Sequence, residues 1–422
     1  MSDSLAGSPT PDKADFNLLQ TLWYSVANFG FGCFYGLNNA IISLFLGRFT
    51  KNAVIIGLMA SSHSFEGVLI QPVVGAMSDR CMSRLGRRRP FILLCIPVSV
   101  LFMLLTPVAA TLPANVRLIA LIVCICLFTA TFNVANDPYQ SLMPDITPPD
   151  HRGRVTGLWT LIGVLGQAMI LLLPLPIEMK IEITAVTMLF ATLITCWKVR
   201  EKPLQDEPKG SHVHWFQLRE ALRGISTLGQ ARLALLIYFF YGLGVGAVLP
   251  FLTTYVHKIA HATDQQAENM FLVLMVFTAI AILPCGRYTD KVGASRMLQA
   301  GLFLVLIAAI AGAVASTLPQ IAAAMALAGV GNAALSASAY PLLTLLVPAR
   351  EIGIYTGLQT AAASIAQPLT VAVTGVLTND GGYRYIFVVC CVGVLIAMLL
   401  LTRLRPETVG AEIAARELEL GL

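Results

Sequence analysis

Apolar segments long enough to cross a bilayer follow one another along almost the whole chain. The hydrocarbon core of a membrane is about 30 Å thick and requires roughly 20 apolar residues per helix. Of the 422 residues, 56% are apolar and only 12% are charged, a composition that soluble globular chains do not have. The sequence therefore predicts an all-α membrane protein. Twelve transmembrane helices are expected, over residues 18–46, 54–77, 90–110, 118–143, 155–175, 183–197, 233–256, 270–286, 297–316, 321–347, 354–377 and 385–404.

One long polar interruption divides these helices six and six. We therefore predict two helical bundles joined by a cytoplasmic linker, with a cytoplasmic tail at each end of the chain. The predicted bounds are a tail over residues 1–17, a bundle over 18–200, the linker over 201–231, a second bundle over 232–405 and a tail over 406–422.

Lysine and arginine residues indicate the orientation, because cytoplasmic loops carry an excess of both. Placing the two termini in the cytoplasm assigns all but six of the 28 basic residues to that side. We expect a multi-pass protein of the cell membrane whose basic loops face anionic lipid rather than nucleic acid. The six exceptions are Arg48, Lys51, Arg117, Lys180, Lys258 and Arg384.

The sequence shows no sign of catalytic or metal-binding chemistry. The nine cysteines lack metal-ligand spacing, so small reduced thiols are expected. No phosphate-binding loop and no nucleophile with an adjacent base is recognisable. These observations argue against an enzyme and against a bound cofactor or metal, and we expect a monomer.

A short pattern occurs in both halves and indicates an internal duplication. In each half, a glycine is followed four residues later by an aspartate and a basic residue, just after a predicted helix. Two pseudo-symmetric six-helix bundles follow from this repeat, with a solute site near the membrane midplane between them. The matching residues are Gly75, Asp79 and Arg80 in the first half and Gly286, Asp290 and Lys291 in the second.

The repeated charges are placed for gating. Asp79 can lie near the start of the eleventh helix, where free backbone amides and the helix dipole favour an anion. Asp290 can do the same for the fifth helix, beside Arg152 and Arg154. Such contacts form only when the cytoplasmic ends of the halves meet, so we expect them to stabilise one of two states. Arg87 and Arg88, in the same loop as Asp79, either pair with nearby acids or face lipid headgroups.

This repeated pattern resembles the signature of the major facilitator superfamily. The segment QPVVGAMSDRCMSRLGRRRPF, residues 71–91, is similar to the corresponding loop of the sucrose and proton symporter family of plants and its animal and bacterial relatives. The resemblance implies a secondary transporter that moves a sugar or glycoside with protons. That family usually has an arginine two residues after the proline of the fourth helix, whereas Gln140 follows Pro138 here. We therefore predict the sugar class without naming the sugar.

Two acidic residues fall inside predicted helices, where a carboxylate is costly and points to function. Glu66 precedes Gly75 by nine residues, about 14 Å along a helix, and Asp137 lies at a comparable depth in the fourth helix. We expect these carboxylates to bind and release protons, while sodium coupling stays open. His63 precedes Glu66 by one turn, and we expect it either to take part in proton coupling or to form a buried pair with Glu66 that has no transport role. We expect no acidic residue inside a helix of the second half. This expectation assigns proton coupling to the first half.

Neutral polar side chains on the first, fourth, seventh and tenth helices are the candidates for solute binding. Amides and tyrosines supply the hydrogen bonds and the aromatic faces that a sugar requires, although the same groups also join membrane helices to one another. The candidates are Asn28, Tyr35, Asn38, Asn39, Asn133, Asn136, Gln140, Tyr238, Tyr241, Asn332 and Tyr340.

Two alternatives stay open at this point. The first is an exporter of the same fold that exchanges protons for amphipathic compounds. The second is a facilitator-fold protein that handles pigment or assists assembly and transports nothing soluble.

Overall fold

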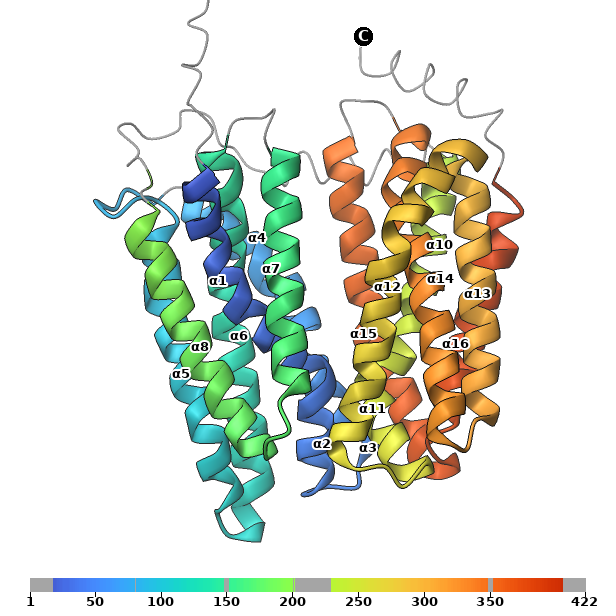
Figure 1. The fold of residues 1–422 in the computed structure, drawn as a ribbon, viewed down its shortest axis with the longest axis horizontal. Coiled ribbons are helices and arrows are strands. Elements are labelled where there is room, and N and C mark those ends of the chain that lie inside the picture. The colour runs from blue at the N-terminus through green and yellow to red at the C-terminus, as the bar shows by residue number, and fades with distance from the viewer. Residues whose placement is uncertain are drawn as a thin grey trace, which may run out of the picture.

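A computed structural model of the protein describes residues 18–79, 81–147, 152–199, 201, 229–347 and 352–404. Helices joined by turns make up this part of the chain, and no strand occurs in it. Figure 1 shows two groups of steep helices standing side by side. The two predicted tails and residues 202–228 of the predicted linker lie outside the described residues.

The first group of helices carries the breaks that later position the candidate site. Its elements are α1 (Leu18–Gly36), the π-helix η1 (Leu37–Ile41), α2 (Ile42–Gly47), α3 (Ala53–Ala60), α4 (Ser62–Asp79), α5 (Arg89–Ala110), α6 (Ala114–Ile146), α7 (Arg152–Leu172) and α8 (Ile177–Lys198).

The second group repeats this order with one helix broken near its middle. Its elements are α10 (Gly229–Val248), the 3-10 helix η3 (Leu249–Phe251), α11 (Leu252–Ile259), α12 (Asp264–Val292), α13 (Ala294–Val314), α14 (Leu318–Leu346), α15 (Ile352–Gly381) and α16 (Tyr385–Leu401).

The same helix pairings occur in both groups. In the first, α1 packs against α7 and α8, and both α4 and α5 pack against α6. In the second, α10 packs against α15 and α16, and both α12 and α13 pack against α14. Because the paired helices hold the same places in each order, the two groups are pseudo-symmetric repeats, as the sequence predicts.

Twelve membrane crossings account for the described helices. Nine stretches are long and apolar enough to span a bilayer, by length and composition. The other three crossings are α3 with α4, α15, and the shorter apolar α16. The predicted fold class is therefore confirmed, whereas the interruption of the second crossing at Ser61, between α3 and α4, is not predicted from the sequence.

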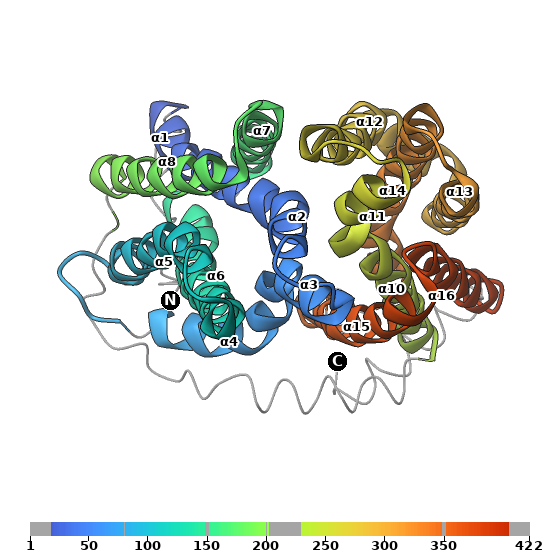
Figure 2. The ribbon, with the colours of Figure 1, turned by 90° about the horizontal axis from the view of Figure 1, so that it is seen from below.

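The two groups contact each other mainly at one end. We call the side where α1 begins and α16 ends the termini face, and the opposite side the far face (Figure 1). Figure 2 looks onto the far face and shows α2 and α3 beside α11 and α15, which they contact. Backbone and side-chain hydrogen bonds join the groups there, including Ser43 to Thr253 at 2.7 Å and the Ala53 amide to Asn379 at 2.8 Å.

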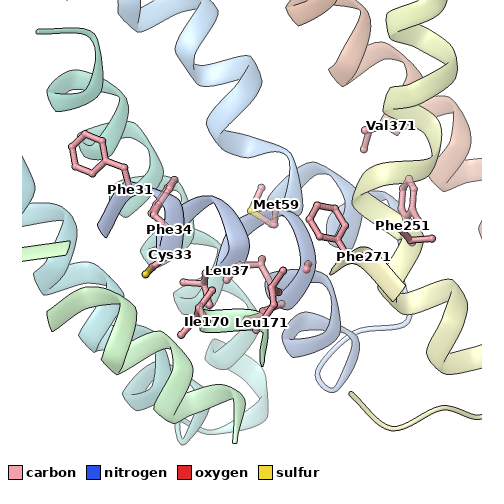
Figure 3. Packing of buried hydrophobic residues seen from close by; sticks show 14 of the residues in the cluster. Phe31, Cys33, Phe34, Leu37, Met59, Ile170, Leu171, Phe251, Phe271 and Val371 are labelled. Carbon is pink, nitrogen blue, oxygen red and sulfur yellow. The ribbon is translucent and has the colours of Figure 1, made fainter. Parts of the chain in front are cut away.

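The hydrophobic core continues from one group into the other at this end. Figure 3 shows Met59 of the first group beside Phe271 of the second, and all of the labelled residues belong to one buried cluster. Gly57 of α3 makes this approach possible, because a Cβ atom there would stand 2.6 Å from a ring carbon of Phe251. The contact surface between the two groups at the far face, which we call the seam, thus depends on the absence of a side chain at Gly57.

Candidate functional site

A polar cluster lies inside the first group, where η1, α4 and α6 meet. His63 Nδ1 and Asn38 Oδ1 are 2.7 Å apart, and His63 Nε2 is 3.2 Å from the Ser64 hydroxyl. Asn133 donates a hydrogen bond of 2.9 Å to the backbone carbonyl of His63. Three helices that are distant in sequence therefore share one hydrogen-bonded network, which we call the His63 cluster: Asn38, His63, Ser64 and Asn133.

Two irregularities of the backbone bring this cluster together. Asn38 lies in the π-helix η1, and His63 lies in the first turn of α4, just after the break at Ser61. π-helical turns within α-helices occur frequently at functional sites. The irregular backbone is found where polar side chains, rather than lipid, surround it, as expected for a membrane-buried site.

Aromatic rings enclose the histidine on the α1 side. The rings of Tyr35 and His63 lie edge to face with centroids 5.6 Å apart, and Phe34 stacks on Phe132 at 3.7 Å. The Tyr35 hydroxyl is oriented toward Asn136 of α6, whose side chain is buried. Tyr35, Asn38, Asn133 and Asn136 are thus gathered in one place, and their role in solute binding stays a prediction.

Glu66 stands one turn beyond His63 on α4 and faces Thr129 of α6. Its Oε2 atom is buried and has no hydrogen-bond partner. The sequence left open a buried pair between Glu66 and His63. In the structure the ring nitrogens of His63 lie close to Asn38 and Ser64, so neither ring nitrogen is paired with Glu66 in this state.

Asp137 lies against α4, nearer the termini face than Glu66. A Cβ atom on Gly75 would stand 3.1 Å from Asp137 Oδ2, so the two helices approach closely at this point. Gly75 is one of the predicted gating residues. Because glycine has no side chain, this position leaves room for the Asp137 carboxylate. Glu66 and Asp137 therefore lie along the same contact between α4 and α6.

Several predicted solute-binding residues serve helix packing in this structure. Asn28 donates a 2.7 Å hydrogen bond to the Trp159 carbonyl and joins α1 to α7, and the Tyr238 hydroxyl donates a 2.7 Å bond to the Ala339 carbonyl. Tyr241 donates to Asn332 Oδ1 at 3.2 Å, beside a mostly apolar cavity within the second group. The remaining candidates form no described cluster: Asn39 is half-buried, and Gln140 and Tyr340 are exposed.

The loop between α4 and α5, which carries Arg87 and Arg88, forms a charged cluster within the first group. The Arg87 guanidinium pairs with Asp145 and lies 3.6 Å from Glu201, while Arg88 Nε lies 3.3 Å from Asp145. Glu201 also accepts a 2.9 Å hydrogen bond from the Arg88 amide, and the Arg88 guanidinium donates to Ser78. Of the two roles left open for these arginines, the structure supports pairing with acids.

The remaining gating residues are only partly described. Asp290 and Lys291 are exposed, and neither forms an ion pair with any described residue. A Cβ on Gly286 would meet nothing within 4 Å, unlike one on its counterpart Gly75. Arg80 and the side chains of Asp79, Arg152 and Arg154 lie outside the described residues, so the predicted contacts across the termini face stay predictions.

A second charged cluster joins the two groups at the far face and was missed from the sequence. Lys180 of α8 pairs with Glu268 of α12, and each side chain is only 1% exposed. The expectation of no acid within a helix of the second half was therefore wrong. Hydropathy windows placed the starts of these helices at residues 183 and 270, because charged first turns lower local hydropathy, whereas α8 begins at Ile177 and α12 at Asp264.

Two six-helix repeats with carboxylates buried between their helices define a secondary membrane transporter of the facilitator type. The sequence profile of the Major Facilitator Superfamily matches residues 24–232 and 234–420. The chain belongs to this superfamily and is an MFS transporter.

Two sugar-transport proteins are similar to the chain over limited regions. The chain is 29% identical over 168 residues to proton-associated sugar transporter A of Mus musculus, covering 37% of this chain and 22% of that protein. It is 29% identical over 141 residues to sucrose transport protein SUC3 of Arabidopsis thaliana, covering 26% and 24% respectively. The matched region thus spans about a quarter or less of each relative.

Solved structures share the fold over nearly the full length. The crystal structure of a bacterial homolog of the human lysosomal transporter Spinster, in an inward-facing and unoccupied conformation, superposes with a TM-score of 0.68 at 15% identity. The match covers 94% of this chain and 97% of that one. At this identity the likeness establishes the fold alone.

Proposed function

We propose that this transporter moves a small, uncharged, hydroxyl-rich solute of the sugar class together with protons, by alternating access. The observation that carries the proposal is the buried Glu66 carboxylate beside the His63 cluster, on the contact between α4 and α6 that also holds Asp137. The names of the mouse and Arabidopsis relatives, a proton-associated sugar transporter and a sucrose transport protein, support the sugar class.

Glu66 is the first candidate for the coupling proton. A carboxylate oxygen that is buried without a hydrogen-bond partner is unfavourable while it is charged, and binding a proton removes that charge. His63 and Asn38 lie nearby, and their bond joins η1 of the first crossing to the start of α4, just after the break in the second crossing. Protonation of Glu66 can therefore change the packing of α3 and α4, which meet at that break.

Asp137 is the second candidate, and its place beside Gly75 ties it to the predicted gate. The residue follows Asn136 and precedes Gln140 by less than one helical turn, so proton and solute groups share one stretch of α6. The neutral amides and Tyr35 offer a sugar both donors and acceptors. We propose that solute binding involves this stretch of α6 and η1.

We place the termini face in the cytoplasm, following the distribution of basic residues. In this orientation the described hydrogen bonds and ion pairs between the two groups lie on the outer side, where Ser43 meets Thr253 and Lys180 meets Glu268. The described state is then closed to the outside. Closure of the termini face would produce the opposite state of the cycle.

Proteoliposomes with an imposed pH gradient test the proposal. Purified protein should take up a labelled disaccharide or polyol down the proton gradient, and uptake should cease when a protonophore collapses the gradient. Glu66→Gln and Asp137→Asn should abolish accumulation against a concentration gradient, while exchange of solute at equal concentrations persists. Glu182→Gln is the matched control, because Glu182 of α8 is exposed and its removal should leave uptake unchanged.

The outcome of the same assay separates the alternatives. Absence of gradient-dependent uptake for every sugar and polyol tested would reject the sugar assignment. Solute movement opposite to the proton flux would favour the exporter. Full accumulation by both Glu66→Gln and Asp137→Asn would remove these carboxylates from coupling and leave the proposal without its main support.

A further inference from the structure

The contact between Lys180 and Glu268 is unusual for its position. Both side chains are 1% exposed, yet they come from different groups of helices, α8 in the first and α12 in the second. Removing two charges from water is expensive, and a buried pair recovers this cost only when its remaining polar atoms are also satisfied. The far-face seam therefore contains a charged contact whose stability depends on how fully its polar atoms are hydrogen-bonded.

Gln265 supports this contact from the same helix as Glu268. Its Oε1 atom accepts a 3.1 Å hydrogen bond from Lys180 Nζ, and its Nε2 atom donates a 2.6 Å bond to the Leu171 carbonyl at the end of α7. One turn of α12 thus holds the ends of both α7 and α8. These two helices and α12 belong to the parts that must separate if the far face opens.

The satisfaction of the pair is nonetheless incomplete. Glu268 Oε1 is buried and has no hydrogen-bond partner. A buried carboxylate with one unsatisfied oxygen is less stable than a fully hydrogen-bonded one, and hydration of that oxygen would stabilise it. This arrangement suits a contact that closes and opens repeatedly better than a permanent brace.

A second, exposed ionic layer lies on the same seam. Arg48 pairs with Glu178 at 2.9 Å within the first group and with Asp264 of the second at 2.7 Å, and His257 lies 3.4 Å from Asp264. The side chains of Arg48 and Glu178 are 41% and 40% exposed. Water therefore screens their interaction. The buried pair, rather than the exposed layer, should dominate the energy of closure.

We propose that Lys180 and Glu268 form a latch that holds the far face closed, and that the two side chains separate each time the far face opens. They are positioning residues, which set the balance between the two states without contacting the solute. The inference rests on the alternating access contained in the proposed function. It does not depend on which solute or ion is moved.

A buried cysteine at the seam reports opening of the far face. Ser43 is 0% exposed and hydrogen-bonded to Thr253 across the groups, so a thiol in Ser43→Cys reacts only when the seam opens. The protein is reconstituted in nanodiscs and treated with a membrane-impermeant maleimide, and the chain without this substitution gives the background from native cysteines. Because the reagent reaches both faces, the measurement is independent of membrane orientation and requires neither sugar nor pH gradient.

The latch predicts a specific order of labelling rates. Glu268→Gln or Lys180→Met, added to Ser43→Cys, should accelerate labelling at least about tenfold, because either one leaves a buried group unpaired in the closed state. The exchanged pair Lys180→Glu with Glu268→Lys should return the rate to within about twofold of the parent. Glu178→Gln in the exposed layer should change the rate by less than about twofold.

Unchanged labelling in well-folded Glu268→Gln would overturn the proposal, as would an exchanged pair that labels as fast as the single variants. If Glu268→Gln does not yield monodisperse protein, Glu268→Asp replaces it, since it keeps the charge and shortens the reach. For Glu268→Asp, a labelling rate between that of the parent and that expected of Glu268→Gln supports the latch. A rate equal to that of the parent rejects it. Failure of sugar uptake in proteoliposomes leaves these rates unaffected, so the two proposals fail independently.

Discussion

The carboxylate of Asp137 lies against the backbone of Gly75, so that a methyl group on the glycine would stand 3.1 Å from Asp137 Oδ2. This is closer than ordinary van der Waals contact, and either the carboxylate or the helix must move to accept it. The contact joins a residue proposed for proton coupling to the first glycine of the repeated loop pattern.

Gly75→Ala should therefore reduce proton-driven uptake about tenfold, equivalent to about 1.4 kcal/mol in transition-state free energy, while the protein stays folded. Gly286→Ala is the matched control. It alters the equivalent glycine of the second repeat, where an added Cβ meets nothing within 4 Å, and should leave uptake close to that of the unmodified protein. Equal losses in both variants would show that the two glycines act through backbone flexibility instead.

The two arginines that pair with Asp145 should differ in their importance. The Arg88 side chain is 7% exposed and that of Arg87 is 26% exposed. Arg88→Gln removes a nearly buried guanidinium that bonds both Asp145 and the buried Ser78 and should lower the free energy of unfolding by about 2 kcal/mol or more, whereas Arg87→Gln should cost about 1 kcal/mol or less. Thermal unfolding of the purified variants checks the order, and a larger loss for Arg87→Gln would contradict it.

Gly57 should tolerate no larger side chain while the far face is closed. Gly57→Val places new atoms where the Phe251 ring lies and should accelerate maleimide labelling of Ser43→Cys. Adding Phe251→Ala should slow that labelling again, because the smaller side chain relieves the overlap. If Phe251→Ala does not slow the labelling of the Gly57→Val variant again, this account of the seam is wrong.

Asn133 should stabilise the break between α3 and α4. Asn133→Leu removes the hydrogen bond to the His63 carbonyl and should cost about 1–2 kcal/mol, in the range for buried hydrogen bonds within and between membrane helices. Asn39→Leu is the comparison, since Asn39 is half-buried and forms no hydrogen bond described in the structure. Its thermal midpoint should stay within a few degrees of the unmodified protein.

The fold could be predicted from hydropathy because the membrane requires each crossing to satisfy its own backbone hydrogen bonds. The interruption at Ser61 and the π-helix at Leu37–Ile41 could not, since neither segment contains a proline, and the polar residues at 61–64 and 38–39 do not by themselves indicate a change of helix geometry. The His63 cluster was predicted as separate candidates, and only the structure unites Asn38 with His63. Lys180 and Glu268 escaped notice because helix ends near a membrane surface commonly carry charge, and sequence alone does not show that these two are buried together.

The breaks in the first, second and seventh crossings leave short helical ends at the far face: α2, α3 and α11. Each of these ends is joined to the longer part of its crossing through a segment whose hydrogen-bonding register has changed, at η1, Ser61 and η3. Each short end can therefore tilt at its joint without an equal tilt of the longer part of the same crossing. Opening of the far face can thus begin in α2, α3 and α11 before the longer helices of the two groups move apart.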